Sequence, residues 1–529
     1  MAGTPRTLWG PRTRDIARTY GPAALVALTI AAWQLGHFGG LYAASDDSYI
    51  YLGYVKRALT PPRALFSYNP GEHSAGTTGV VYYYALIAAA AFVRPWTWFL
   101  PLSTTLMLAM WLVNAVLFVG CAGLLTRMVR QLTDSSAVWE MLGLALLVSS
   151  VKFMWGMFAG LENPLTAFLV VALAYELMIG VRLARIAALS GLLIGTRPDL
   201  APTVALIPTF GAVRAVLRDA PAGQSTWQTL RAAWRAVALR AASATLGAAA
   251  VYGVLVLPCY VLTGHIFPSA VGTRIRIGAL GDAKILWQGI AGFDISLLWR
   301  NTWSLANLGL LACLAAAARW QDVRVPLTAM AFVALQSCLR IVLRLFDLSA
   351  EDRYVSYLWP LYVLAIISLL YGLVSWSRAT STLLTRPAVS AAAGALLAVY
   401  AVLGPLREFD QRFSADVREM NQVVVGPARW MSEHLPPSSR VGMEPAGAIR
   451  VFTDFYLVDV IGLTTVQPAP PGPWSYSEFM RANRVDYVFD YPARVPEIAD
   501  SARYEPVMSW RPEARRHSWG EIGVFRVRD

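Results

Sequence analysis

The segment Ser45-Asp46-Asp47-Ser48-Tyr49-Ile50-Tyr51 directly follows an apolar block at residues 21–42. That block is long enough to cross the roughly 30 Å hydrocarbon core of a bilayer. It lacks an A-x-A cleavage site before a soluble chain, so we interpret it as an uncleaved first membrane span and not as a signal peptide. Two adjacent carboxylates therefore lie where the first span leaves the membrane.

The rest of the chain continues in the same way. Hydrophobic residues make up 56% of the 529 residues and charged residues only 15%, against roughly 25% charged in soluble domains. We therefore expect an α-helical polytopic membrane protein with about eleven transmembrane helices. The further apolar blocks lie at 79–93, 98–126, 138–158, 163–180, 186–196, 200–217, 241–263, 301–318, 326–346, 354–376 and 387–404.

The arginines orient these spans. Basic connections occur at the N-terminus, Arg127 and Arg130, Arg182 and Arg185, residues 214–240, Arg319 and Arg324, and Arg378 and Arg386. Basic loops face the cytoplasm, which places 43–78, 159–162, 197–199, 264–300, 347–353 and everything after 404 outside. The two blocks at 79–93 and 98–126 then share one crossing, so one of them is expected to be re-entrant or interfacial. The formal charge of +12 thus orients a plasma or inner membrane protein and does not indicate nucleic-acid binding.

The chain changes character after residue 404. Short apolar runs at 441–443, 457–461, 485–489 and 522–527 are bounded by Gly, Pro and Asp and predict strands, and 427–434 predicts a helix. We therefore expect two domains: a transmembrane catalytic domain at 1–404, whose first outside loop is 43–78, and an extracytoplasmic α/β domain at 405–529. The four cysteines lie in apolar blocks without a C-x-x-C pair, which argues against a disulfide framework or a cysteine zinc site.

Asp46 and Asp47 are the candidate catalytic residues. In a helix, Asp47 shares a face with Tyr51 and Tyr54, which makes these tyrosines candidate substrate-binding residues. Two adjacent carboxylates in a semi-enclosed site do not both ionise easily, so one is expected to have a raised pKa suited to a general base. The alternative is that both acids merely cap an interfacial helix.

Other polar residues lie at the outer ends of spans and are further candidates for substrate binding. In the first outside loop, Glu72 and His73 follow an Asn-Pro-Gly turn and offer a site for a cation or a sugar, or else form a solvated turn. No metal site is predicted, although a divalent cation stays open as a cofactor. The later candidates are Glu162, Arg197, Asp199, His265, Arg274, Arg276, Arg353 and Tyr354.

These arginines suggest how a phosphate is bound. Arg274 and Arg276 are suited to a phosphate at the membrane surface or to lipid headgroups in general. Arg197 and Asp199 form either part of the site or a purely structural pair. We favour Arg353 and Arg274 for the phosphate, since both are expected at the interface.

The order of these motifs resembles the GT-C superfamily of integral-membrane glycosyltransferases, and within it the actinobacterial terminal β-(1→2)-arabinofuranosyltransferase group. The segments that carry the resemblance are Asp46-Asp47-x-Tyr49-Ile50, Tyr68-Asn69-Pro70-Gly71-Glu72, Gly76-Thr77, Gly160-Leu161-Glu162-Asn163-Pro164, Arg197-Pro198-Asp199, Gly264-His265-x-Phe267-Pro268, Arg353-Tyr354, Arg429-Trp430-Met431-x-Glu433-His434-Leu435-Pro436-Pro437, Ala446-Gly447-Ala448-Ile449 and Asp459-Val460-Ile461-Gly462-Leu463. The chain departs from that pattern at Thr77-Thr78-Gly79-Val80 and at Ser269.

The resemblance implies an inverting transferase that takes a sugar, arabinofuranose in that group, from a polyprenyl-phosphate donor. The acceptor would be a glycan or lipid of the cell envelope on the outer side of the membrane, and Asp46 would be the base. Two other classes remain as alternatives: a secondary transporter or lipid flippase, and a glycan polymerase or ligase. The sequence shows no matching inverted halves of the kind that would indicate a transporter. The 264–300 loop only partly fits the large late outside loop expected of a polymerase.

Overall fold

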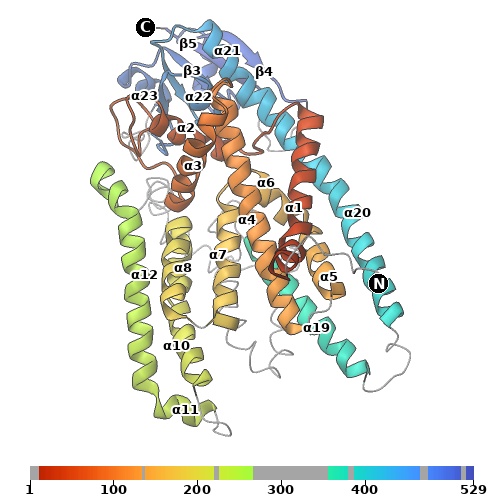
Figure 1. Ribbon diagram of the computed structural model, residues 1–529. Coiled ribbons are helices and arrows are strands. Elements are labelled where there is room, and N and C mark those ends of the chain that lie inside the picture. Colours follow the sequence, from red (N-terminus) through yellow and green to blue (C-terminus); the bar gives the residue numbers. More distant parts are fainter. Residues whose placement is uncertain are drawn as a thin grey trace, which may run out of the picture.

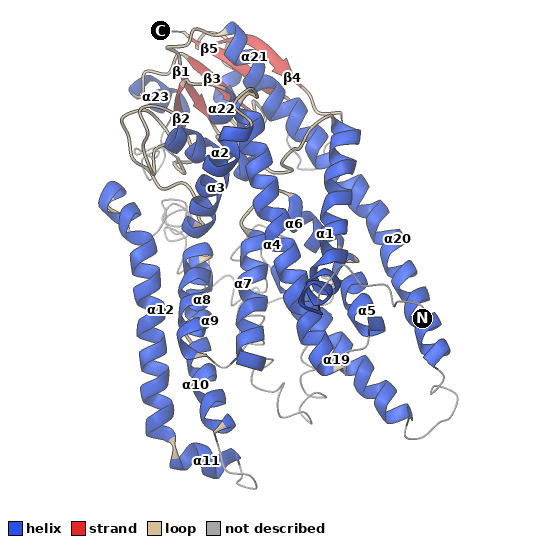
Figure 2. Ribbon diagram, viewed as in Figure 1, coloured by secondary structure: helices blue, strands red, loops and turns tan. Residues whose placement is uncertain are grey.

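The computed structural model describes residues 11–133, 137–180, 182–219, 226–265, 356–378, 387–464, 475–513 and 520–528. Long helices run side by side along most of the molecule, and a small sheet with short helices covers one end of them (Figures 1 and 2). The predicted class, a mostly helical protein with a small C-terminal α/β part, is confirmed.

The helices follow the apolar blocks. Besides short connecting turns, the helical part contains α1 (Pro11–Phe38), α2 (Asp46–Leu59), α3 (Val80–Val93), α4 (Leu102–Leu132), α5 (Ala137–Val148), α6 (Val151–Phe158), α7 (Asn163–Tyr175), α8 (Leu183–Thr196), α9 (Ala201–Val204), α10 (Ile207–Arg218), α11 (Thr226–Ala232), α12 (Trp234–Thr263), α19 (Trp359–Arg378) and α20 (Pro387–Met420).

Within the described residues, α4 and α12 are each long and apolar enough to span a membrane alone. A third span results if α5 and α6, which meet at a bend of 74°, are taken together. That bend has a local cause, because the Ser150 hydroxyl accepts the Phe153 amide and starts a new helix there. The blocks at 301–318 and 326–346 lie outside the described residues, so the count of about eleven spans stays a prediction.

The two blocks that share one crossing fold into unequal helices. The helix α4 has 31 residues, whereas α3 has 14 and is about 21 Å long at 1.5 Å per residue. It lies beside α2 under the sheet (Figure 1). By itself α3 is shorter than the roughly 30 Å hydrocarbon core, and the expectation that one of the two blocks does not cross stays a prediction.

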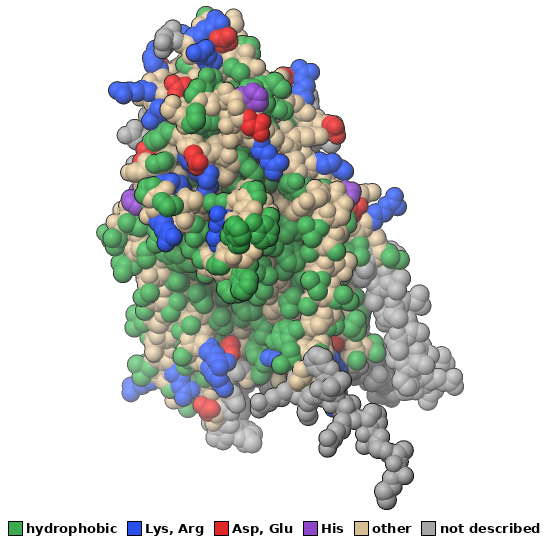
Figure 3. Space-filling view, turned by 45° about the horizontal axis from the view of Figure 1, so that its top comes forward, with side chains coloured by type: hydrophobic (Ala, Val, Ile, Leu, Met, Phe, Trp, Pro, Cys, Tyr) green, Lys and Arg blue, Asp and Glu red, His purple; other side chains and the backbone are tan. Residues whose placement is uncertain are grey.

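Apolar side chains cover the middle of the molecule. Figure 3 shows a band of hydrophobic side chains with Lys and Arg gathered toward its two ends. Along α12, Leu246, Val254, Leu257 and Val261 are more than half exposed. Such a continuous exposed apolar surface is typical of a lipid-facing protein.

The charged segments assigned to the cytoplasm also come together. Arg18 and Arg130 both bind the Glu140 carboxylate, at 2.6 and 2.9 Å, and Arg130 also pairs with Asp15 at 2.6 Å. This cluster joins α1, α4 and α5 away from the sheet.

The C-terminal part contains a five-stranded sheet in the order β2-β1-β3-β5-β4. The strands are β1 (Arg440–Met443), β2 (Tyr456–Asp459), β3 (Tyr487–Asp490), β4 (Tyr504–Trp510) and β5 (Ile522–Val527). Parallel pairing joins β1 to β2 and β3, whereas β5 pairs antiparallel with β3 and β4. The short helices are α21 (Gly426–His434), α22 (Gly447–Phe452) and α23 (Tyr476–Ala482).

The helix α20 joins the two parts of the molecule. It runs without a break from Pro387 to Met420, so the boundary predicted at residue 404 falls inside a helix. Phe409, Phe413 and Val417 recur every four residues and are buried, and the first two rings contact Trp33 of α1. This buried stripe keeps the charged second half of α20 helical and packed on the bundle.

Candidate active site

The candidate site lies where α2 meets the C-terminal sheet domain. Asp46 is the first residue of α2, and its carboxylate accepts the backbone N–H of Gly447 at 3.1 Å and of Ala448 at 3.2 Å. These two groups begin α22, where unpaired N–H groups and the helix dipole favour a negative charge. In open α/β sheets a ligand usually occupies this place after a parallel strand, whereas here it is held by a side chain of the first outside loop.

The environment of Asp46 suits a proton acceptor. Burial and the neighbouring charge of Asp47 outweigh the two hydrogen bonds and raise the pKa of Asp46 to about 7. A base with a pKa near the working pH is the most effective one. This matches the expectation that one acid of the pair has a raised pKa.

Lys56 of α2 holds the opposite end of α22. Its ammonium forms an ion pair with Asp454 at 2.9 Å. It also donates to three backbone carbonyls, those of Arg450, Val451 and Thr453, at 3.2, 3.3 and 2.9 Å. The carboxylate at the start and the ammonium at the end both oppose the dipole of α22. The helix α2 therefore fixes α22 at both ends.

Tyr51, one turn after Asp47, faces a second polar cluster. Its hydroxyl donates to Glu162 at 3.2 Å, lies 3.1 Å from the Thr78 hydroxyl and accepts the Gly79 N–H at 2.9 Å. Glu162 is buried at the start of α7. The structure thus brings together the predicted outside segments 43–78 and 159–162.

Arg197 completes this cluster. It is buried, lies 3.8 Å from the Glu162 carboxylate, and places its guanidinium 5.7 Å from the ring centre of Tyr357. Glu162, which belongs to another helix, is therefore an acidic neighbour of Arg197. The side chain of Asp199 lies outside the described residues; its backbone forms a short 3₁₀ turn with Pro198.

Tyr54 points to a different stretch of the loop. Its hydroxyl lies 2.8 Å from the Ser74 hydroxyl and accepts the Gly76 N–H at 2.8 Å. Ser74 in turn donates to the Thr464 carbonyl at 2.7 Å. The two tyrosines that the sequence places on one face of α2 thus fix two successive parts of the first outside loop.

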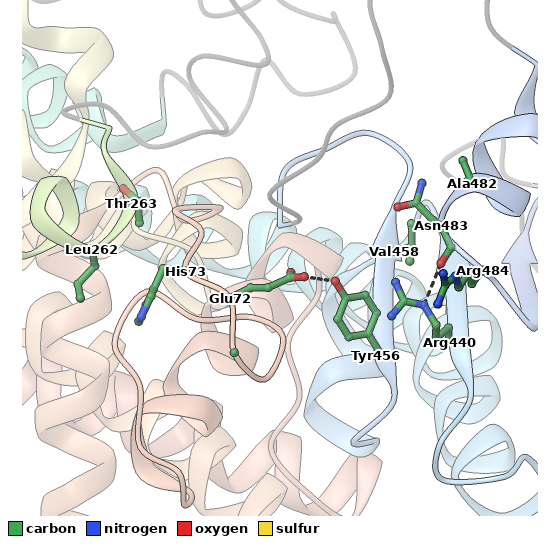
Figure 4. A pocket seen from close by; sticks show the side chains of 11 residues that line it. Glu72, His73, Leu262, Thr263, Arg440, Tyr456, Val458, Ala482, Asn483 and Arg484 are labelled. Carbon is green, nitrogen blue, oxygen red and sulfur yellow. Dashed lines mark hydrogen bonds between the residues drawn. The ribbon is translucent and has the colours of Figure 1, made fainter.

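Glu72 and His73 line a pocket between the first outside loop and the sheet domain (Figure 4). The Glu72 carboxylate accepts the Tyr456 hydroxyl. Nδ1 of His73, an exposed side chain, lies 3.0 Å from the Leu65 carbonyl. The pocket is lined by Gly71, Glu72, His73, Leu262, Thr263, Arg440, Tyr456, Val458, Ala482, Asn483 and Arg484.

Of the remaining candidates, one lies among the described residues. His265 is exposed just after α12. Arg274, Arg276, Arg353 and Tyr354 lie outside the described residues. Among the residues that are described, no group of three His, Cys, Asp or Glu side chains is placed to hold a metal ion.

Several residues of this junction were not predicted. Arg450 is fully buried and donates 2.7 Å hydrogen bonds to the Asn69 side chain and to the Phe455 carbonyl. Asn69 also pairs with the N–H and the carbonyl of Leu457, at 2.9 and 2.8 Å. The Asn-Pro-Gly turn therefore docks on strand β2. The sequence signalled only a turn here, because nothing local indicates which strand it contacts.

Asp459 anchors the loop that follows β2. Its buried carboxylate accepts four backbone N–H groups, those of Ile461, Gly462, Leu463 and Thr464, at 2.8 to 3.2 Å. That loop packs against Ser74 and Gly76. Two of the C-terminal segments that carry the resemblance, 446–449 and 459–463, thus contact the first outside loop directly.

In this arrangement a helical bundle carries the C-terminal sheet domain at one end, and the loop after the first helix docks under that domain. The chain is similar in structure to the oligosaccharyltransferase AglB from Archaeoglobus fulgidus, solved with an inhibitory peptide and a dolichol-phosphate (TM-score 0.53, 13% identity, covering 98% of this chain and 74% of that one). It is also similar to ArnT from Cupriavidus metallidurans, solved bound to undecaprenyl phosphate (TM-score 0.56, 13% identity, covering 96% and 97%). At such low identity these likenesses establish the fold.

Two comparisons of the sequence add to this. Residues 415–525 match a family model described as a domain of unknown function, DUF8728. No curated protein matches the chain in sequence. The match covers the end of α20 and most of the sheet domain, which identifies that region as a recurring unit.

Proposed function

We propose that this protein is a membrane glycosyltransferase that moves a sugar from a polyprenyl-phosphate donor to a glycan or lipid acceptor. The observation that carries the proposal is the Asp46 carboxylate, which has a pKa near 7 and is held by the start of α22 at the outer junction. The shared fold supports it, since AglB and ArnT were solved with dolichol-phosphate and undecaprenyl phosphate respectively.

In this proposal the reaction is a single displacement with inversion. Asp46 takes the proton of the acceptor hydroxyl while that oxygen attacks the anomeric carbon. The bond from the anomeric carbon to the phosphate oxygen breaks, and its electron pair leaves with the polyprenyl phosphate. The two N–H groups of α22 orient the Asp46 carboxylate, and the charge of Asp47 keeps the pKa of Asp46 high.

The donor phosphate requires a cationic partner, because its charge grows as the bond breaks. We assign this role to Arg353 and Arg274. Arg197 is discounted because it is buried beside Glu162 at 3.8 Å.

We further propose arabinofuranose as the sugar, about eleven membrane spans, a catalytic domain at 1–404 and an outward-facing domain at 405–529. Transport and polymerisation remain the alternatives.

Radiolabel transfer from purified polyprenyl-phosphate sugars into membrane glycans tests this function. We expect Asp46→Asn to lower turnover by about 10² to 10⁴, the usual cost of losing a general base. Asparagine replaces one carboxylate oxygen by an amide NH2 group, which then faces an N–H donor of α22. The variant therefore also weakens the contact between residue 46 and α22.

Lys56→Met is the control that separates the two effects, since it loosens the other end of α22 and leaves the carboxylates intact. In folded protein we expect Lys56→Met to keep most of the parent protein's turnover, whereas Asp46→Asn loses it. Equal losses in both variants would make Asp46 a positioning residue. Near-normal turnover in both Asp46→Asn and Asp47→Asn would show that the catalytic assignment is wrong.

A further inference from the structure

The pocket beside Glu72 is formed by parts of the chain that are far apart in sequence. Its walls come from the first outside loop, the end of α12, the edge strand β2 and the turn between α23 and β3 (Figure 4). The volume is about 740 Å³, within the range of roughly 300 to 1,000 Å³ that is usual for ligand sites. Among the residues that the structure describes, β2 is the last strand on its side of the sheet, and no described strand covers this wall.

One wall of the pocket presents two guanidinium groups. Arg440 is held in place, because its guanidinium lies 3.8 Å from the ring centre of Tyr456 and its Nε donates to the Asn483 carbonyl at 2.8 Å. Arg484 is exposed on the adjacent turn, where its backbone has a φ of 52°. A planar guanidinium held in this way is suited to a carboxylate, which it binds through two parallel hydrogen bonds.

The carboxylate among the lining residues, that of Glu72, is already engaged. It accepts the Tyr456 hydroxyl, and the Asn69 amide lies 3.4 Å from its other oxygen. The two arginines therefore exceed the acidic charge among the lining residues, so the pocket favours an anion. Most of the lining is polar, with Leu262, Val458 and Ala482 as the aliphatic exceptions, which favours a hydroxyl-rich ligand over a lipid chain.

We propose that this pocket binds an anionic saccharide segment of the acceptor, with a carboxylate of the sugar on Arg440 and Arg484. The proposal rests on the proposed function, because a transferase of this kind must hold an acceptor glycan at the outer junction. The loop that forms the pocket continues directly to Gly76 and Gly79, which Tyr54 and Tyr51 fix. A saccharide bound here is a non-reacting part of the acceptor, and its binding energy orients the reacting hydroxyl.

Direct binding to the full-length protein in lipid nanodiscs tests this site without any turnover. The probes are oligosaccharides of galacturonic and of glucuronic acid, each compared with its carboxyl-reduced neutral form, in calorimetric titrations. We expect at least one acidic probe to bind at least tenfold more tightly than its neutral form. Arg440→Ala and Arg484→Ala should each weaken that binding at least tenfold.

Arg511→Ala is the matched control, because it removes an equal charge from an exposed site of the same domain, where Arg511 pairs with Glu521. It should change the affinity less than twofold. Arg484→Ala also covers the case in which Arg440→Ala misfolds, since the Arg484 side chain is exposed. Equal binding of acidic and neutral probes, no binding of either, or equal losses in Arg484→Ala and Arg511→Ala would overturn the proposal.

The two proposals fail separately. Arginine-dependent binding of an acidic saccharide, with sugar transfer unaffected by Asp46→Asn and Asp47→Asn, would leave the pocket in place and refute the catalytic assignment. Sugar transfer that depends on Asp46, without arginine-dependent saccharide binding, would support the proposed enzyme activity and refute the role of the pocket in acceptor binding.

Discussion

At the scale of single residues, Asp46 both joins distant parts of the chain and carries a carboxylate with a raised pKa. Its carboxylate joins two parts of the chain that are 401 positions apart, and its pKa is raised to about 7. The contact keeps the carboxylate in one orientation, which a base requires. Asp47 influences this group through its charge, because a second anion nearby makes ionisation of Asp46 harder.

The pH dependence of sugar transfer tests this coupling. Asp46 is protonated below its pKa and then cannot accept a proton, so kcat/KM should fall as the pH drops below about 7. Asp47→Asn removes the neighbouring charge and should shift this fall to lower pH. The measurement is kcat/KM between pH 5 and pH 9, roughly the range in which the group titrates. An unchanged midpoint in Asp47→Asn would rule out the charge coupling.

At the scale of elements, the pair formed by α2 and α22 positions the site. The helix α22 is clamped at its start by Asp46 and at its end by Lys56. Between these ends the two helices approach closely at Gly53, where a Cβ atom would lie 2.8 Å from both the Arg450 and the Tyr68 side chains. Glycine is therefore required here by close packing.

Gly53→Ala tests that packing. The added methyl group has no room, so we expect the free energy of unfolding to fall by about 1–3 kcal/mol, as is usual for overpacking. Sugar transfer should fall with it, because α22 carries the groups that orient Asp46. The measurement is the apparent Tm in detergent together with the transfer rate.

Gly253→Ala is the control for this variant. Gly253 lies in α12, where a Cβ atom would meet nothing within 4 Å, and alanine is favoured over glycine in a helix by about 1 kcal/mol. Its Tm and transfer rate should stay at or above those of the parent protein. Equal behaviour of the two variants would show that α2 and α22 are not tightly packed.

At the scale of the whole molecule, the arrangement of charges predicts a single orientation in the membrane. The sheet domain and α11 lie at opposite ends of the helical bundle (Figure 1). Basic residues flank α11, so we expect this end to lie in the cytoplasm. The C-terminal domain and the candidate site then face outward.

Two exposed alanines allow a matched test of that orientation. In a background without the native cysteines, Ala499→Cys lies in the sheet domain and Ala232→Cys at the end of α11. An impermeant maleimide on intact cells should label position 499 and leave position 232 unlabelled until the membrane is opened. The reverse pattern would invert the topology and place the site on the cytoplasmic side.

The sequence by itself determined the features that depend on short stretches of chain. Within the described residues the apolar blocks became helices, and the four predicted strands appear as β1, β2, β3 and β5. The strand β4 was missed because most of its residues are exposed and it begins Tyr504-Glu505-Pro506. A local pattern of hydropathy and turn residues is sufficient where burial follows that pattern.

Only the tertiary structure decided which distant groups meet. Asp46 contacts α22, Tyr51 contacts Glu162, and Arg197 lies beside Glu162. Nothing in the chain between such residues encodes the pairing. It results from the packing of whole helices and of the sheet domain, which brings these polar groups to partners that offset the cost of their burial.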